Sequence, residues 1–134
     1  MTTQPLFTAN DLIYAYTRQQ ALEDGVQVSA NEGDLAEVTR QHYKYPVYMT
    51  DAVWTLIETA VNNPRYCNDL KGVWHDILWM SRIYSRRVDE STSEFVVKIV
   101  GTGRKSVFHM IAQCGPVDID KPAPCITIMM PDEL

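Results

Sequence analysis

Hydrophobic residues recur every three or four positions in three stretches of the first two-thirds of the chain, and this spacing is typical of amphipathic helices. The first stretch, 33–44, has Leu35, Val38 and Tyr43 between charged residues. The second, 50–63, is predicted to begin after an N-cap at Thr50 and to end before Pro64, because threonine caps helix starts and proline stops helices. Its apolar face consists of Val53, Trp54, Ile57, Ala60 and Val61.

The third stretch, 68–88, is the longest and is predicted to form the central helix of the core. Its broad apolar face consists of Leu70, Val73, Trp74, Ile77, Leu78, Ser81, Tyr84 and Val88. At 100° per residue, an arc of about 80° on the opposite side holds Lys71, His75, Trp79, Arg82 and Arg86. Such a cationic and aromatic row can bind a phosphate backbone or an acidic protein face. The alternative is a solvated face whose arginines pair with carboxylates and whose tryptophan packs under another element.

After Ser93 the hydrophobic period becomes two, which is typical of strands with one buried face. Phe95, Val97 and Ile99 alternate with their neighbours, and a second alternating run extends over 107–113. CITIMM (125–130) is predicted to be a third strand, and the Pro-rich segment GPVDIDKPAP (115–124) before it a stiff loop. Strands with such short links most simply form an antiparallel meander.

These elements together predict a single α+β domain, 1–134, with residues 1–10 as a loose N-terminal arm. The helices are expected to pack on one face of a small antiparallel sheet, formed by the three-stranded C-terminal meander and an extra edge strand at 26–28. If CITIMM is an exposed edge, it can pair across a two-fold axis, so a homodimer is open.

The stretch YTRQQALEDGVQV (16–28) combines an arginine, two carboxylates and a glycine, which raises the question of a catalytic site. Thr17 and Gln20 have the spacing of a capping box, and Gly25 stands where a helix ends in a left-handed residue. The favoured interpretation is therefore a two-turn helix with its own caps. Capping leaves Arg18 and Asp24 unexplained, and these two could reach each other or a partner.

Composition excludes several classes of protein. The net charge of −5, from 12 basic and 17 acidic residues, argues against non-specific nucleic-acid binding but leaves room for a local basic patch. No apolar run approaches the roughly 18 residues of a membrane span, and the first residues lack the pattern of a secretory signal. Cys67, Cys114 and Cys125 are odd in number and contain no C-x-x-C pair, so a cytoplasmic protein without a disulfide framework is expected.

No catalytic or metal-binding motif stands out in the chain. His75 and Asp76 are adjacent on a predicted helix and point about 100° apart, so they cannot orient each other. Without H-x-x-x-H or C-x-x-C spacing, neither a metal nor another cofactor is predicted. His109 is expected to be a packed strand residue. Cys67 lies near a predicted helix start, but a Cys-His enzyme would need His75 or His109 beside it.

Four segments give the chain a family likeness: YTRQQALEDGV (16–26), YPVYMTDAVW (45–54), HDILWM (75–80) and ITIMMPDE (126–133). In order and spacing they resemble a family of small uncharacterised proteins carried by bacteriophages, plasmids and other bacterial mobile DNA. That family has no established activity or catalytic residues, so the resemblance implies a genetic setting and no mechanism. Accessory proteins in this setting commonly bind a host or element protein, including restriction and CRISPR machinery.

Three functions are therefore carried forward. The leading hypothesis is a non-enzymatic accessory protein of bacterial mobile DNA that binds a protein partner, with counter-defence as one role. The second is nucleic-acid binding through the basic face of helix 68–88. The third is an enzyme that uses Arg18, Glu23 and Asp24 beside His75, which requires a pocket that holds all four groups.

Overall fold

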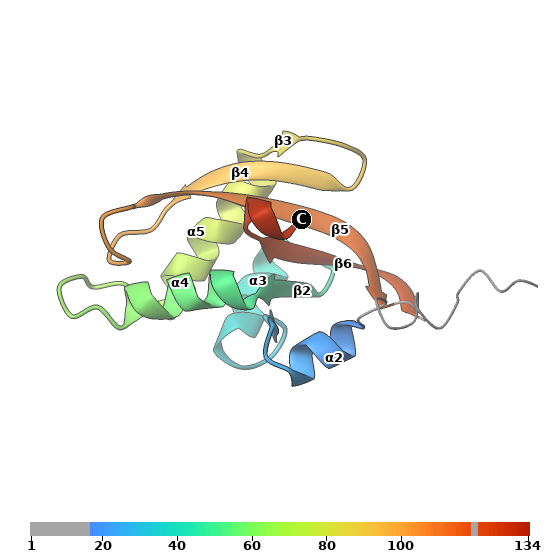
Figure 1. The fold of residues 1–134 in the computed structure, drawn as a ribbon, viewed down its shortest axis with the longest axis horizontal. Helices are drawn as coiled ribbons and strands as arrows, with labels where there is room; N and C mark the ends of the chain where they lie inside the picture. The colour runs from blue at the N-terminus through green and yellow to red at the C-terminus, as the bar shows by residue number, and fades with distance from the viewer. Residues whose placement is uncertain (1–16, 119–120) are drawn as a thin grey trace, which may run out of the picture.

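The computed structural model describes residues 17–118 and 121–134, which form a six-stranded sheet with helices packed against it (Figure 1). The predicted N-terminal arm, 1–10, lies outside the described residues. The helices are α2 (Arg18–Glu23), η1 (Gly33–Leu35), α3 (Ala36–His42), α4 (Asp51–Val61), α5 (Leu70–Ile83) and η2 (Pro131–Glu133), where η denotes a 3₁₀ turn. The strands are β1 (Gln27–Ser29), β2 (Val47–Thr50), β3 (Arg86–Arg87), β4 (Thr92–Lys98), β5 (Val107–Asp118) and β6 (Lys121–Met129). The α+β class is confirmed.

The sheet has the strand order β1-β2-β6-β5-β4-β3. The predicted meander is present, since β5 pairs antiparallel with both β4 and β6. The sequence did not predict β2, which pairs parallel with β6 and places Val47 opposite Ile126. The predicted edge strand is β1, and it pairs with β2. Because β6 lies between β2 and β5, CITIMM is interior to the sheet, and its prediction as an exposed edge was wrong.

The segment predicted to be a Pro-rich loop is a β-ribbon instead. β5 continues to Asp118 and β6 begins at Lys121, with Pro116 opposite Pro124 and an irregular register beyond them. β4 pairs with β5 only as far as Gln113, and β2 pairs with β6 only over 126–128. The ribbon therefore extends beyond the other strands, and its outer edges pair with no further strand. A proline there, which lacks a backbone N–H, removes no hydrogen bond between strands.

The core lies between one face of the sheet and helices α3, α4 and α5; in Figure 1, α3 and α5 lie behind the strands. The predicted alternation is confirmed, because Phe95, Val97 and Ile99 are all buried. They meet the apolar face of α5, whose buried members are Val73, Trp74, Ile77 and Leu78. The opposite face of the sheet also buries Ile111 and Met129, on the side of η2 in front of the strands.

Helix α5 is shorter than the predicted span 68–88. It begins after Asp69, whose carboxylate accepts a hydrogen bond from the backbone N–H of Gly72, and it ends at Ile83. Tyr84 and Val88, predicted to be core residues, have exposed fractions of 64% and 51%. The chain leaves the helix at Tyr84 because Arg86 and Arg87 pair with β4, opposite Glu94 and Ser93.

The start of α4 also differs in detail from the prediction. Thr50 occupies the N-cap position but makes no side-chain capping bond. Its hydroxyl donates instead to the carboxylate of Glu133 in η2. Thr50 thus ties the C-terminal turn to the junction of β2 and α4. In the part of the chain that the structure describes, no helix has both the length and the apolar character needed to cross a membrane.

Candidate functional site

The packing of α3 against α5 brings together histidines that are 33 residues apart. Trp74, fully buried in α5, donates from Nε1 to the hydroxyl of Thr39 in α3 over 2.9 Å. That hydroxyl in turn donates to the backbone carbonyl of Ala30 over 2.6 Å. This buried chain fixes the two helices, because breaking it leaves a polar group without a partner. His42 lies one helical turn after Thr39, and His75 follows Trp74 directly.

The two histidines form a hydrogen-bonded pair at the surface. His42 Nε2 and His75 Nδ1 are 2.8 Å apart, and the ring centroids are separated by 4.7 Å. Trp79 stacks on His75 with a centroid distance of 6.0 Å, and Arg82 lies 5.8 Å from the centre of the Trp79 ring. Successive turns of α5 therefore place His75, Trp79 and Arg82 in one row along the helix surface.

The surroundings of His42 favour its neutral form. Burial lowers its pKa from the ordinary value of 6.5, and the nearby His75 and Arg82 lower it further. Its Nδ1 atom is buried without a hydrogen-bond partner among the described residues. We assign the Nε2–H tautomer to His42, because a lone pair at the buried position costs less than an N–H without an acceptor. His42 then donates to His75.

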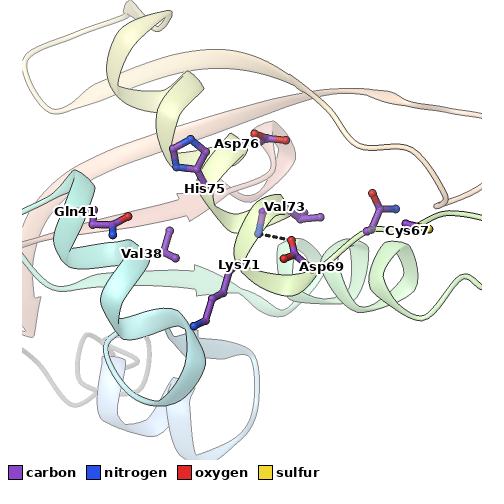
Figure 2. A pocket seen from close by; sticks show the side chains of 10 residues that line it. Val38, Gln41, Cys67, Asp69, Lys71, Val73, His75 and Asp76 are labelled. Carbon is purple, nitrogen blue, oxygen red and sulfur yellow. Dashed lines mark hydrogen bonds between the residues drawn. The ribbon is translucent and has the colours of Figure 1, made fainter.

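A hollow of about 410 Å³ lies beside this pair, between α3 and the first turns of α5 (Figure 2). Gln41 and Val38 line it from α3, and Lys71, His75 and Asp76 line it from α5. Cys67 lies at its far rim, well apart from His75, with the start of α5 between them (Figure 2). The structure therefore does not show a Cys67–His75 pair.

Four of the five predicted members of the basic face lie together on α5: Lys71, His75, Trp79 and Arg82, all exposed. We call these four residues the α5 outer face. Within residues 17–118 and 121–134, neither Lys71 nor Arg82 makes a salt bridge. Trp79 is 40% exposed and is not packed under another element. The alternative, in which the arginines pair with carboxylates and the tryptophan is covered, is therefore contradicted for Arg82 and Trp79.

Arg86 was wrongly placed on this face. It lies on β3, after the end of α5, and forms a salt bridge with Glu94 on β4. The helical period of the sequence continues past Ile83, so periodicity gives no signal that the helix stops there.

Arg18 has a structural role on the opposite side of the sheet. Its guanidinium donates to the carbonyl of Val117, to Gln27 Oε1 and to the hydroxyl of Thr127, and it lies 4.4 Å from the centre of the Tyr48 ring. Burial raises the pKa of Tyr48, and Arg18 opposes that shift. Asp24 stands at the C-cap of α2. Arg18 thus fastens α2 to the sheet.

The capping account of 17–25 is confirmed. Thr17 and Gln20 form a reciprocal capping box, and Gly25 has a φ of 77°, in the left-handed region. The proposed catalytic group is not assembled, because Arg18, Glu23 and Asp24 do not line the hollow beside His75. His109, predicted to be packed, is exposed on β5. Among the described residues, no group of three or more His, Cys, Asp or Glu is placed to hold a metal ion.

His42 is the member of the site that sequence reasoning missed. It lies near the end of a predicted helix, and nothing in the sequence indicates which face of that helix meets 68–88. The fold and site define an α+β domain with an exposed helix face of basic and aromatic residues. The chain belongs to a family of unknown function, DUF6573, whose model matches residues 3–134. Searches of curated proteins and of solved structures each found no match.

Proposed function

We propose that this chain is a non-enzymatic binding module that contacts a partner protein through the α5 outer face. The observation that supports this most directly is the exposure of Trp79. Trp79 is 40% exposed, whereas Trp74 on the same helix is fully buried in the core. Arg82 lies over its ring. Exposed tryptophan and arginine are the residue types that contribute most binding energy at protein interfaces.

The charge of this face indicates the chemistry of the partner. Lys71 and Arg82 have no carboxylate partner within the described chain, whereas the whole sequence carries a net charge of −5. A local cationic face on an acidic protein favours an acidic patch on the partner and disfavours indiscriminate contacts. The His42–His75 pair adds polar contacts, and the lowered pKa of His42 disfavours a further charge on that ring.

Nucleic-acid binding through the same face is the second candidate. The observation that favours it is the cation next to an exposed aromatic ring, an arrangement on which bases stack. Because Arg86 lies on β3 and pairs with Glu94 on β4, the face keeps two cationic side chains, Lys71 and Arg82. Each neutralised phosphate adds to affinity through counterion release, so two cations provide a small part of what nucleic-acid binding requires. A protein partner is therefore preferred.

The biological setting is part of the proposal and rests on the sequence resemblance. It is that of an accessory protein encoded on a bacteriophage, plasmid or other bacterial mobile DNA, which acts in the cytoplasm on a host or element protein. Restriction and CRISPR machinery are the counter-defence targets of this class. The three free cysteines, Cys67, Cys114 and Cys125, agree with a reducing compartment.

Affinity capture from bacterial lysate tests the proposal, with nuclease-treated and untreated lysate in parallel and mass spectrometry of the retained material. A specific protein in stoichiometric amount, retained after nuclease treatment, is the expected result. If the retained material is lost on nuclease treatment, the result would support nucleic-acid binding through the α5 outer face instead. Failure to retain a stoichiometric partner from the lysates of several bacterial hosts would count against both.

A further inference from the structure

Helix α5 ends before the sheet does, and this leaves part of the helix-facing side of the sheet uncovered. By strand alternation, Ser93, Ala112, Cys114 and Ile126 lie on the same face as the core residues Phe95 and Met110. They line a hollow of about 260 Å³ beside the last turn of α5, which contributes Ser81 and Arg82. Cys114 is exposed there, so the floor of the hollow is open to solvent.

The walls of this hollow supply hydrogen-bond donors from two elements. Arg82 and Ser85 lie at the end of α5, and Arg87 is the last residue of β3. Tyr43, which also lines the hollow, already donates its hydroxyl proton to Ser81, because the Ser81 hydroxyl donates to the carbonyl of Leu78. Arg87 donates from Nη1 to the carbonyl of Glu90, and neither arginine has a salt bridge within the described residues. A guanidinium has five N–H donors, so both arginines keep donors for a ligand.

The serine hydroxyls add to this surplus of donors. Ser85 and Ser93 make no side-chain hydrogen bond to any described residue, and both side chains are half-buried. One opposing charge is present, because Glu90 also lines the hollow. Two guanidiniums outweigh it, so the lining favours an anion.

We propose that this hollow binds a small organic phosphate monoester. The phosphate lies between Arg82 and Arg87, with hydrogen bonds from Ser85 and Ser93. A tetrahedral group with three acceptor oxygens suits donors that arrive from separate elements. The organic part rests on Ala112 and Ile126. The volume is below the roughly 300–1,000 Å³ of sites for drug-sized ligands, which restricts the ligand to a small molecule.

Calorimetry on the full chain with phenyl phosphate, inorganic phosphate and benzoate as probes tests the proposal. Phenyl phosphate should bind saturably and at least about tenfold more tightly than either other probe, since each of them lacks one of the two recognised parts. Arg87→Ala should weaken phenyl phosphate binding by a similar factor, and Glu90→Gln should strengthen it. Arg104→Ala, in the exposed turn between β4 and β5, is the matched control and should have no effect.

A second measurement needs no variant. Bound phenyl phosphate should slow alkylation of Cys114 by iodoacetamide, followed by mass spectrometry, whereas Cys67, exposed outside this hollow, should react at an unchanged rate. Absence of saturable binding, an Arg87→Ala affinity equal to wild type, or an unchanged Cys114 rate at saturation would each overturn the proposal. Arg82 belongs to both surfaces, whereas Arg87 and Cys114 lie outside the α5 outer face, so the Arg87→Ala and Cys114 results are distinguishable from a failure of partner capture.

Discussion

His42 Nε2 and His75 Nδ1 are 2.8 Å apart, so the two rings share a hydrogen bond that requires one nitrogen to donate and the other to accept. Protonation of both rings would place two cations at this contact and remove the acceptor. The pair therefore joins α3 to α5 only while at least one ring is neutral. Arg82 reinforces this requirement from the next turn of α5.

The first prediction follows from the lowered pKa of His42. NMR titration should show His42 with a pKa below 6.5, and His75→Gln or Arg82→Gln should raise it by removing repulsion. Burial remains in both variants, so neither should restore the value of 6.5. In the folded state His42 binds a proton less readily than in the unfolded chain. Its contribution to stability is thus complete above pH 6.5 and declines as the pH falls through the lowered pKa. A His42 resonance that titrates above 6.5 would contradict this.

The second prediction concerns the buried link between α3 and α5. Thr39→Val removes the acceptor of Trp74 Nε1–H and the donor to Ala30, and should cost about 1–3 kcal/mol in the free energy of unfolding. Trp74→Phe removes the indole N–H, which is the donor that Thr39→Val leaves without an acceptor. Urea denaturation of the double variant should therefore show a smaller loss than the sum of the two single losses. Strictly additive losses would mean that the Thr39–Trp74 hydrogen bond does not couple the helices.

The third prediction concerns Arg18. Arg18→Met retains the aliphatic stem but removes the guanidinium bonds to Val117, Gln27 and Thr127, and hydrogen bonds of a charged group contribute about 1.5–3 kcal/mol. Hydrogen exchange should increase most in α2, which these bonds fasten to the sheet. The pKa of Tyr48 should rise further, because Arg18 opposes the effect of burial. Equal loss of protection across the core would show that Arg18 acts on global stability instead.

The fourth prediction separates Arg82 from Arg86. Arg86→Ala breaks an exposed salt bridge with side-chain exposures of 77% and 42%, so it should change stability by less than about 1 kcal/mol. It should also leave partner binding unchanged, because Arg86 lies on β3. Arg82→Ala should weaken partner binding while the fold is retained. If both variants lost partner binding equally, Arg86 would have to be counted as part of the binding surface.

The sequence predicted most of the local structure because its signals are local. The caps Thr17, Gln20 and Gly25 and the alternation of Phe95, Val97 and Ile99 depend on neighbouring residues, and both are present in the structure. β2 could not be predicted in this way, since its parallel pairing with β6 joins Val47 to Ile126. The end of α5 was missed for the same reason, because the pairing of Arg86 with Glu94 replaces a helical turn that the apolar pattern allows.

The candidate site was predicted in part. Lys71, His75, Trp79 and Arg82 follow from the helical period, whereas His42 reaches them only through the packing of α3 on α5. Arg18 shows the converse. Its local context suggested a site, but its partners come from β1, β6 and the end of β5, which a pattern in 16–28 cannot reveal.

Capture of partner by Trp79→Ala, compared with Tyr66→Ala, tests the central claim most directly. Both aromatic side chains are comparably exposed, at 40% and 46%, but Tyr66 lies outside the α5 outer face. Loss of a hot-spot residue costs about 2 kcal/mol or more, which is about thirtyfold in Kd. We predict that Trp79→Ala loses the nuclease-resistant partner and that Tyr66→Ala retains it at the wild-type level. Wild-type retention by Trp79→Ala would contradict the assignment of the α5 outer face as the binding surface.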